Sequence, residues 1–327
     1  MVPGIVGLGG TWRAAHRVWG LPLWVGEALM LTGTLVWAVL IVLYGRKWRA
    51  APEAARREVD DPIQCCFIGL IGVTTSLVAL AVLPYSRPFA QALFGAGALF
   101  TLGFALWRTG GLWQGGRDHQ TTTPVLYLPT VAGAFVTAIG AAALGGPDWG
   151  QLAFGAGVFS WLAIESVLLH RLYTVSPLPL ALRPVLGIQL APPTVGAVAY
   201  LSVTTGPPGL AAHLLLGYGL LQALILLRLL PWITRQPFAP SYWAFSFGVT
   251  ALATAPLEMI ERGDSGVAAL LAPFLFVAAN LVLILLTVAT LRLAAQGRLL
   301  PIPAKTTHAD HAENHTENHA DHANGIY

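Results

Sequence analysis

The segment SYWAFSFGVTALATAP, residues 241–256, decides the fold class, because it carries no charge and is apolar enough to lie in a bilayer. It also holds a glycine at its middle, Gly248, several hydroxyl side chains, and two phenylalanines, Phe245 and Phe247, on either side of a serine. A helix that only filled space would not need this mixture. The segment therefore predicts a membrane-spanning helix with one face turned toward something other than lipid.

The composition of the whole chain places it among integral membrane proteins. Of its 327 residues, 55% are hydrophobic and only 10% are charged, whereas about 25% are charged in a typical soluble protein. The net charge of +3 is small, and the basic residues are scattered between apolar runs. This pattern indicates membrane topology and excludes nucleic acid as the expected partner.

Ten segments have the roughly 20 apolar residues that a membrane-spanning helix needs. They lie at 1–20, 23–45, 64–83, 88–107, 125–145, 150–172, 184–204, 209–230, 240–260 and 266–292. The first is the weakest, because Arg13 and Arg17 interrupt it. The longest polar connection, 46–62, predicts a short amphipathic or flexible link. The expected fold is all-α, a polytopic membrane protein of ten helices.

The distribution of lysine and arginine predicts the orientation. Fourteen of the 18 basic residues follow even-numbered segments and four follow odd-numbered ones. Because basic residues accumulate on the cytoplasmic side, both termini are expected to be cytoplasmic. The start of the chain, MVPGIVGLGGTW, has neither the basic region nor the cleavage site of a secretory signal.

The ten segments also repeat in pairs. The even-numbered ones end at arginines spaced by 62, 63, 57 and 64 residues, namely Arg46, Arg108, Arg171, Arg228 and Arg292. Four odd-numbered ones open at a proline, Pro62, Pro124, Pro184 or Pro240, and contain a second glycine or proline a few residues later. This regularity predicts five helical hairpins of one design. The first hairpin lacks an opening proline, so the natural start of the protein is expected upstream.

Odd-numbered and even-numbered helices differ in character. The even ones are continuous and bulky, as in LVWAVLIVLY, which suits an outer ring in contact with lipid. The odd ones carry helix breakers and hydroxyls, which suits an inner ring around a path. The predicted path-lining residues are Thr75, Thr130, Thr137, Thr194, Ser202, Ser246, Gly248, Thr250 and Thr254. The alternative is that these small and hydroxyl side chains only pack helices closely together.

A helical wheel singles out Phe247 as a candidate gate. With Ser246 at 0°, Thr250 lies at about 40°, Thr254 at about 80° and Phe247 at about 100°, whereas Phe245 lies at about −100°. Phe247 can therefore plug a hydroxyl-lined path, or it packs against a neighbouring helix. No lysine or arginine lies in the third, fifth, seventh or ninth helix. A pore of hydroxyls and helix dipoles binds anions weakly, as conduction requires, so small anions are the expected cargo.

The chain closely resembles the tellurite-resistance/dicarboxylate transporter family, which includes the slow anion channels of plant guard cells. The matching segments are TTPVLYLPTVAGAFVTA (122–138), FGAGVFSWLAIESVLLHRL (154–172), GIQLAPPTVGAVAYLSV (187–203), GYGLLQALILLRLLPW (217–232) and SYWAFSFGVTALAT (241–254). The resemblance extends from Trp12 to about Leu300. It implies a homotrimer, with each protomer built from five hairpins in quasi-fivefold arrangement around a pore that a phenylalanine of the ninth helix closes. That phenylalanine corresponds to Phe247.

One departure from the family concerns Glu165 in the sixth helix. The family has a proline after this glutamate, and here Ser166 stands in its place. The sixth helix is therefore expected to be straighter, and the role of Glu165 does not follow from the resemblance. Glu165 either couples transport to protons or pairs with a neighbouring helix.

Two domains are expected, a ten-helix transmembrane domain over 1–300 and a disordered, cytoplasmic, histidine-rich tail over 301–327. If helical, the tail would place His311, His315, His319 and His322 on one face, a weak candidate for metal binding. Cys65 and Cys66 are adjacent within an apolar segment, where small buried residues are expected in place of a disulfide or zinc site. No cofactor is predicted.

These features predict a gated anion channel, or channel-like exporter, in the cell (inner) membrane, associated by resemblance with tellurite resistance. The alternative is a proton-coupled carrier of dicarboxylate or sulfite, with Glu165 as the coupling group. An enzyme is disfavoured, because the membrane segments contain no serine–histidine pair, metal-ligand cluster or cofactor motif.

Overall fold

The computed structural model describes residues 1–298, which are helical and contain no strand. The α-helices are α1 (Val2–Trp19), α2 (Leu23–Ala50), α3 (Pro52–Asp60), α4 (Gln64–Ile68), α5 (Leu70–Val82), α6 (Arg87–Trp113), α7 (Gly133–Ala143), α8 (Pro147–Thr174), α9 (Ala191–Val203), α10 (Leu210–Ile233), α11 (Ser246–Glu261) and α12 (Val267–Ala295). Short helical turns of tighter or wider winding lie between them, namely η1 (His119–Thr121), η2 (Pro124–Leu126), η3 (Leu128–Ala132), η4 (Leu180–Leu190) and η5 (Pro240–Phe245). The predicted all-helical class is confirmed for this part of the chain. The tail, 301–327, lies outside the described residues.

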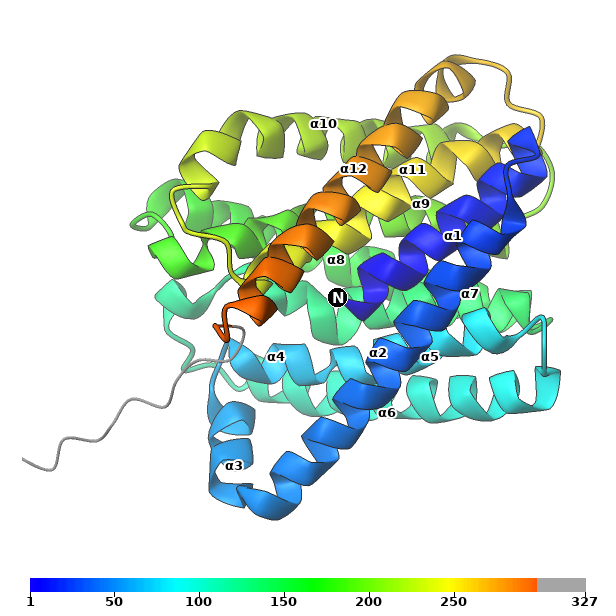
Figure 1. Ribbon diagram of the computed structural model, residues 1–327. Coiled ribbons are helices and arrows are strands. Elements are labelled where there is room, and N and C mark those ends of the chain that lie inside the picture. The colour runs from blue at the N-terminus through cyan, green and yellow to red at the C-terminus, as the bar shows by residue number, and fades with distance from the viewer. Residues whose placement is uncertain (299–327) are drawn as a thin grey trace, which may run out of the picture.

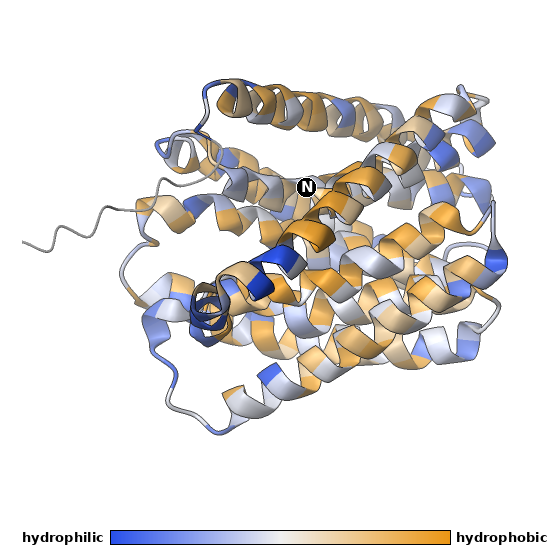
Figure 2. Ribbon diagram, turned by 60° about the horizontal axis from the view of Figure 1, so that its bottom comes forward, coloured by the Kyte–Doolittle hydropathy of each residue, from blue (hydrophilic) through white to orange (hydrophobic). Residues whose placement is uncertain are grey.

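Nine helical segments in the described chain are long and apolar enough to cross a membrane. Five of them are the single helices α2, α6, α8, α10 and α12. The other four are composite, Gln64–Val82, Pro124–Ala143, Leu180–Val203 and Pro240–Glu261. The tenth predicted segment is α1, whose two arginines lower its apolar character. Figure 2 shows hydrophobic residues along most of the helix lengths and hydrophilic ones mainly toward the ends.

The composite segments lie inside and the single long helices outside. Between 67 and 83% of the most apolar stretch is buried in the four composite segments, against 11 to 28% in the other five. The predicted division into buried odd-numbered and exposed even-numbered helices is therefore confirmed for these nine segments.

Five helices form a closed circuit of contacts at the centre of the molecule. Helix α1 contacts α5, α5 contacts α7, α7 contacts α9, α9 contacts α11, and α11 contacts α1 again. We call these five helices, with the short turns that lead into them, the inner ring. Each also packs against the outer helix that follows it in the chain, the pairs being α1–α2, α5–α6, α7–α8, α9–α10 and α11–α12 (Figure 1).

Glycine and proline change the winding of the inner segments close to the predicted positions. Gly69 separates α4 from α5, Pro129 lies within the π-helical turn η3, and Pro192 and Pro193 occupy the first turn of α9. Proline cannot donate a backbone hydrogen bond, so it is tolerated in a first turn and disturbs the winding elsewhere.

Gly248 lies two residues inside α11 and allows a close backbone contact. A Cβ atom at this position would lie 2.8 Å from the Cβ of Leu190 and 2.9 Å from the backbone nitrogen of Ala191. A larger residue would therefore push α11 away from the junction of η4 and α9. Gly248 is predicted to line the path, and in the structure it instead makes a packing contact that requires glycine.

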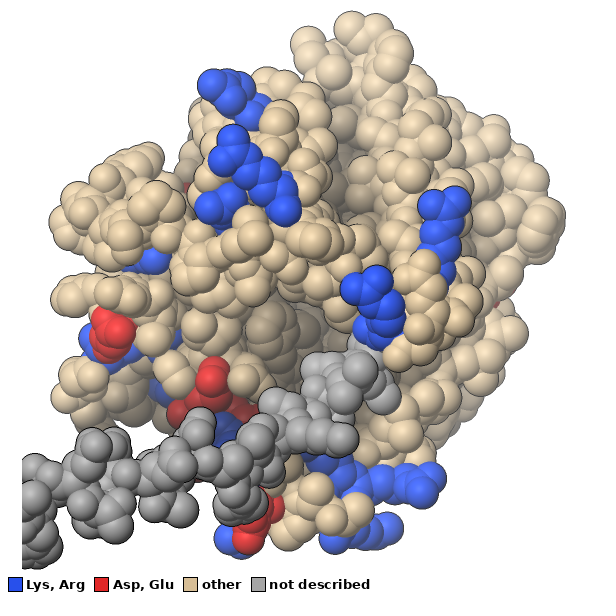
Figure 3. All heavy atoms as spheres, turned by 60° about the vertical axis from the view of Figure 1, so that its left-hand side comes forward, with Lys and Arg blue, Asp and Glu red and all other residues tan. Residues whose placement is uncertain are grey.

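The link at 46–62 follows the amphipathic alternative. Helix α2 extends to Ala50, and α3 follows after one residue. An ion pair between Lys47 of α2 and Glu58 of α3 joins the two helices, and Ala55 is buried. This end of the molecule carries a concentration of Lys and Arg side chains (Figure 3).

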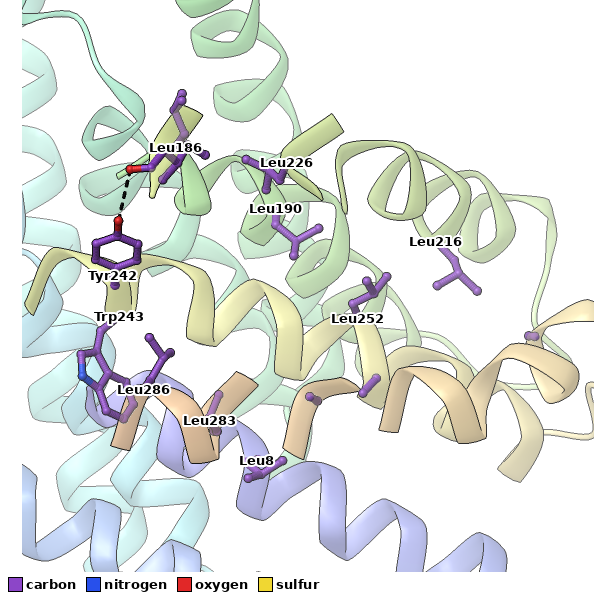
Figure 4. Packing of buried hydrophobic residues seen from close by; sticks show 14 of the residues in the cluster. Leu8, Leu186, Leu190, Leu216, Leu226, Tyr242, Trp243, Leu252, Leu283 and Leu286 are labelled. Carbon is purple, nitrogen blue, oxygen red and sulfur yellow. Dashed lines mark hydrogen bonds between the residues drawn. The ribbon is translucent and has the colours of Figure 1, made fainter. Parts of the chain in front are cut away.

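The largest apolar cluster lies around η4, η5 and the last four helices. Figure 4 shows Leu190, Leu226 and Leu252 in the region between α10 and α11, with Trp243 beside Leu286. The Trp243 indole nitrogen donates a hydrogen bond of 2.9 Å to the Thr290 hydroxyl. The cluster thus anchors α12 to the start of the α11 segment.

Close contact between α5 and α6 predicts opposite effects for two glycines of α6. A Cβ at Gly97 would lie 2.8 Å from the backbone oxygen of Gly72 and 2.9 Å from the backbone nitrogen of Ser76, whereas nothing lies within 4 Å of a Cβ at Gly95. Gly97→Ala should lower the free energy of unfolding by about 1–3 kcal/mol through overpacking. Gly95→Ala should raise it by about 0.5–1 kcal/mol through better helix propensity. Thermal unfolding of both variants in one detergent measures the difference, and equal shifts would contradict the contact.

Candidate functional site

The inner ring surrounds a partly open cavity of about 300 Å³, which we call the central cavity. All five inner segments contribute to its wall. The lining residues include Pro3, Phe67, Leu70, Tyr127, Leu128, Val131, Ala132, Phe135, Ile188, Ala191, Pro192, Val195, Pro240, Ser241, Trp243, Ala244, Ser246 and Phe247. No charged side chain occurs among the described residues that line it. The wall is mainly apolar, and Met1, the first residue of the chain, also lies on it.

Phe247 lies where two apolar clusters meet. One cluster is centred on the α7, α8 and α9 segments and includes Phe135 and Val195. The other brings together α1, α2, α5 and α7 and includes Val73 and Val136. Phe247 packs against both clusters and also lines the central cavity. Its ring therefore occupies the space between opposite sides of the inner ring.

Phe245 points elsewhere, although it is only two residues away. A Cβ at Gly187 would lie 2.5 Å from its ring, so Phe245 packs directly on η4. It also lines a groove on the outer surface between α10 and α12 and does not line the central cavity. The two phenylalanines thus face different sides of the segment, as their helical angles predict.

The three hydroxyls on the predicted face of α11 lie in its contact with α1. Their partners on α1 are Gly4 for Ser246, Gly7 for Thr250 and Thr11 for Thr254. The Thr254 and Thr11 hydroxyls are 2.8 Å apart, and those of Ser246 and Thr250 donate to the backbone oxygens of Trp243 and Phe247. Of the three, only Ser246 also lines the central cavity.

The five predicted hydroxyls on the other inner helices do not line the central cavity either. Thr75 accepts a hydrogen bond of 3.1 Å from the Trp37 indole of α2, and Thr194 donates one of 3.1 Å to the backbone oxygen of Gly248. The remaining three are Thr130, whose buried hydroxyl has no partner in the described residues, and the half-buried Thr137 and Ser202. Thr75 and Thr194 therefore hold neighbouring helices together, as the alternative interpretation of these hydroxyls predicts.

Sequence reasoning missed most of the apolar side chains that do line the cavity, such as Leu70, Val131 and Val195. The sequence signal that could have located the cavity wall is the set of prolines that interrupt the inner segments. Pro192, in the first turn of α9, and Pro240, at the start of η5, both lie on the cavity wall.

Glu165 of α8 is buried, with 7% of its surface exposed, and receives four hydrogen bonds. Its Oε2 accepts from the Tyr127 hydroxyl and from the Trp161 indole nitrogen at 3.0 Å. Its Oε1 accepts from the Tyr218 hydroxyl at 2.9 Å and, at 3.5 Å, from the Gln222 amide. A carboxylate held by this many donors is stable away from water.

The donors around Glu165 come from three segments, so the carboxylate ties the inner ring to two outer helices. Tyr127 also lines the central cavity, which leaves Glu165 directly behind the cavity wall. Helix α8 runs without interruption through Ser166, whose hydroxyl donates to the backbone oxygen of Leu162 at 3.0 Å. The sixth helix is continuous at this position, and its greater straightness relative to the family stays a prediction.

No metal site is found in residues 1–298, where no group of three His, Cys, Asp or Glu side chains could hold an ion. Cys65 and Cys66 are both free and buried. The weak candidates His311, His315, His319 and His322 lie outside the described residues.

A ring of helices around a central cavity, surrounded by long, exposed apolar helices, defines a multi-pass membrane protein with the architecture of a transporter or channel. The chain belongs to the SLAC1 family of voltage-dependent anion channels, which residues 1–291 match. The resemblance seen in the sequence is thereby confirmed.

Relatives within and beyond bacteria agree with this membership. The chain is 35% identical over 297 residues to the tellurite resistance protein TehA homolog of Haemophilus influenzae, covering 90% of this chain and 89% of that protein. It is 24% identical to the S-type anion channel SLAH3 of Arabidopsis thaliana, over 83% of this chain and 43% of the plant protein. For the guard cell S-type anion channel SLAC1 of the same plant the identity is 25%, over 64% of this chain and 38% of that protein. The chain thus spans less than half the length of these plant relatives.

The four hydrogen bonds predict that Glu165→Gln destabilises the fold. A glutamine amide would place its own donor against the hydroxyl and indole donors that now face a carboxylate oxygen. Charge-assisted hydrogen bonds contribute about 1.5–3 kcal/mol, so the free energy of unfolding should fall by at least that amount. Thermal unfolding in detergent measures the loss. Glu53→Gln, on the exposed face of α3, is the control and should leave the unfolding temperature unchanged; equal shifts would show that the four donors contribute nothing.

Proposed function

We propose that the protein is a gated channel for small anions, with Phe247 as the gate. The five helix pairs would stand in quasi-fivefold arrangement, with the path running through the inner ring. The closed circuit of inner-helix contacts and the central cavity that it surrounds support this proposal. Family membership favours transport over catalysis.

The observation that carries the proposal is the position of the Phe247 ring. The ring lines the central cavity and packs against clusters on both sides of it. A large apolar ring across a narrow path blocks ions by its bulk and by excluding water, and it needs no charge for either effect. Displacement of this one side chain would join the cavity to the outer half of the inner ring.

The proposed cargo is anionic, because a cation path is normally lined by carboxylates and the described cavity wall carries none. We propose that Ser246 contacts the ion directly. The other predicted hydroxyls, Thr75, Thr130, Thr137, Thr194, Ser202, Thr250 and Thr254, would act mainly through the packing of the inner helices in this closed state. The H. influenzae relative is named a tellurite resistance protein, so tellurite resistance is among the phenotypes to test.

A proton-coupled carrier of dicarboxylate or sulfite is the second candidate, because Glu165 contacts the cavity wall through Tyr127. If Glu165 were the coupling group, a proton gradient would drive anion uptake into liposomes, and Glu165→Gln would abolish that dependence. Flux that ignores the proton gradient in both proteins would eliminate the carrier.

The proposed location is the cell (inner) membrane, with both termini cytoplasmic and with the tail, 301–327, as a separate cytoplasmic segment. The bias of lysine and arginine toward the loops that follow outer helices supports this orientation.

We also propose that the protein assembles as a homotrimer in which each protomer has its own pore, on the strength of the family resemblance. Native mass spectrometry in a mild detergent should show three chains. A dominant monomer or dimer would contradict this assembly.

The gate predicts that Phe247→Ala raises anion conductance. Burial of a phenylalanine ring contributes about 1.5–3 kcal/mol, which at tenfold per about 1.4 kcal/mol corresponds to about tenfold or more in favour of the closed state. Current recording in planar bilayers at equal protein density measures the change.

Phe245→Ala is the matched control, because its ring packs on Gly187 and faces the outer groove. It should lower stability without raising conductance. If Phe245→Ala opens the pore and Phe247→Ala does not, the gate is assigned to the wrong ring. If neither variant conducts, the channel proposal fails.

A further inference from the structure

A large groove lies on the outer surface between α10 and α12, with a volume of about 950 Å³. These two helices spread apart toward their C-terminal ends (Figure 1). The floor is formed by inner segments, where the half-buried Phe245 of η5 and the buried Leu190 of η4 and Leu252 of α11 line it. Figure 4 shows Leu190, Leu226 and Leu252 in this region. We call this surface the α10–α12 groove.

The α10–α12 groove is apolar along its length and polar at one end. Its polar lining includes Thr234, just after α10, and Gln296, just after α12. Two arginines, Arg292 in the last turn of α12 and Arg298, line the same end. Neither forms a salt bridge within residues 1–298, and no Asp or Glu occurs among the described lining residues. The groove therefore has an uncompensated positive end.

The dimensions of the groove suit a lipid chain. Along α12 it extends from Leu275 to Arg292, which is about 25 Å at the rise of an α-helix. One leaflet of a bilayer has a hydrocarbon depth of about 15 Å. A chain that enters at the charged end can thus lie along the groove for the whole depth of its leaflet.

We propose that the α10–α12 groove binds an anionic phospholipid, with an acyl chain along the groove and the phosphate against Arg292 and Arg298. Arginine presents a planar fork of donors that matches the oxygens of a phosphate group. The charge complementarity at one end and the apolar channel behind it fit an amphipathic anion. A second copy of the chain would need an acidic group opposite the two arginines.

The bound chain would touch the segment that carries Phe247. Phe245 lies on the groove floor, and two residues later Phe247 lines the central cavity on the other side of the same segment. The lipid would therefore stabilise one position of this segment. Binding itself does not depend on the proposed conductance, so it can be tested separately.

The test measures lipid binding to the purified full-length protein. Phosphatidylglycerol and phosphatidylcholine are added to the protein in mild detergent, and bound lipid is counted by native mass spectrometry together with the unfolding temperature. Phosphatidylglycerol should bind more tightly and raise the unfolding temperature more. The double variant Arg292→Ala/Arg298→Ala should lose this preference by about tenfold or more. Arg228→Ala/Arg235→Ala is the matched control, because these exposed arginines lie near the same end but do not line the groove, and it should keep the preference.

A third variant, Ala278→Trp, fills the groove from α12, where Ala278 is exposed on its wall. It should reduce retention of both lipids while the number of chains per assembly stays the same. Unchanged preference for phosphatidylglycerol in the double variant would overturn the proposal. Loss of assembly in Ala278→Trp with unchanged lipid retention would also overturn it, because the groove would then be a contact between copies of the chain.

Discussion

The contact between α1 and α11 closes the inner ring, and the central cavity depends on it. Glycines on α1 remove the side chains that would otherwise hold the two helices apart, so Ser246 and Thr250 of α11 fit against Gly4 and Gly7. Inside a bilayer, lipid tails are as apolar as leucine, and close packing with hydrogen bonds supplies the attraction between helices. The hydroxyl pair of Thr11 and Thr254 adds one such bond. A bulkier α1 would open the ring at this seam.

The described cavity wall has no charged side chain. Two charged residues close to the inner ring, Glu165 and Arg13, each have several hydrogen-bond partners. Glu165 receives four donors behind the wall. Arg13, near the other end of α1, is bound by Glu27 through two hydrogen bonds of 2.8 Å and donates to two backbone oxygens of α5. Arg13 is thus paired with a carboxylate and Glu165 is held by uncharged donors, and neither side chain lines the cavity. This leaves the apolar ring of Phe247 as the main obstacle along the proposed path.

The division into inner and outer helices could be predicted from sequence, because helix breakers and burial obey the same constraint: irregular backbone at membrane depth must lie inside protein. The face of Phe247 followed from helical geometry alone. The lining could not be predicted equally well. A threonine that lines a path and a threonine that packs against a glycine look the same in a sequence, and the difference lies in what the opposite helix presents. Of the partners of Glu165, only Trp161 lies on the same helix, four residues earlier; Tyr127, Tyr218 and Gln222 come from distant segments, which no spacing along the chain could reveal.

The turn η5 gives the start of α11 a further property. Its six residues, Pro240–Phe245, are wound as a 3₁₀-helix, which turns by about 120° per residue, whereas an α-helix turns by about 100°. Over six residues the two windings differ by about 120°. The direction in which Phe247 points relative to Pro240 is therefore set by how tightly this one turn is wound. Rewinding η5 as an α-helix would turn the ring around the axis of its own segment. It would also shorten the turn by about 3 Å, because the rise per residue falls from about 2.0 to about 1.5 Å.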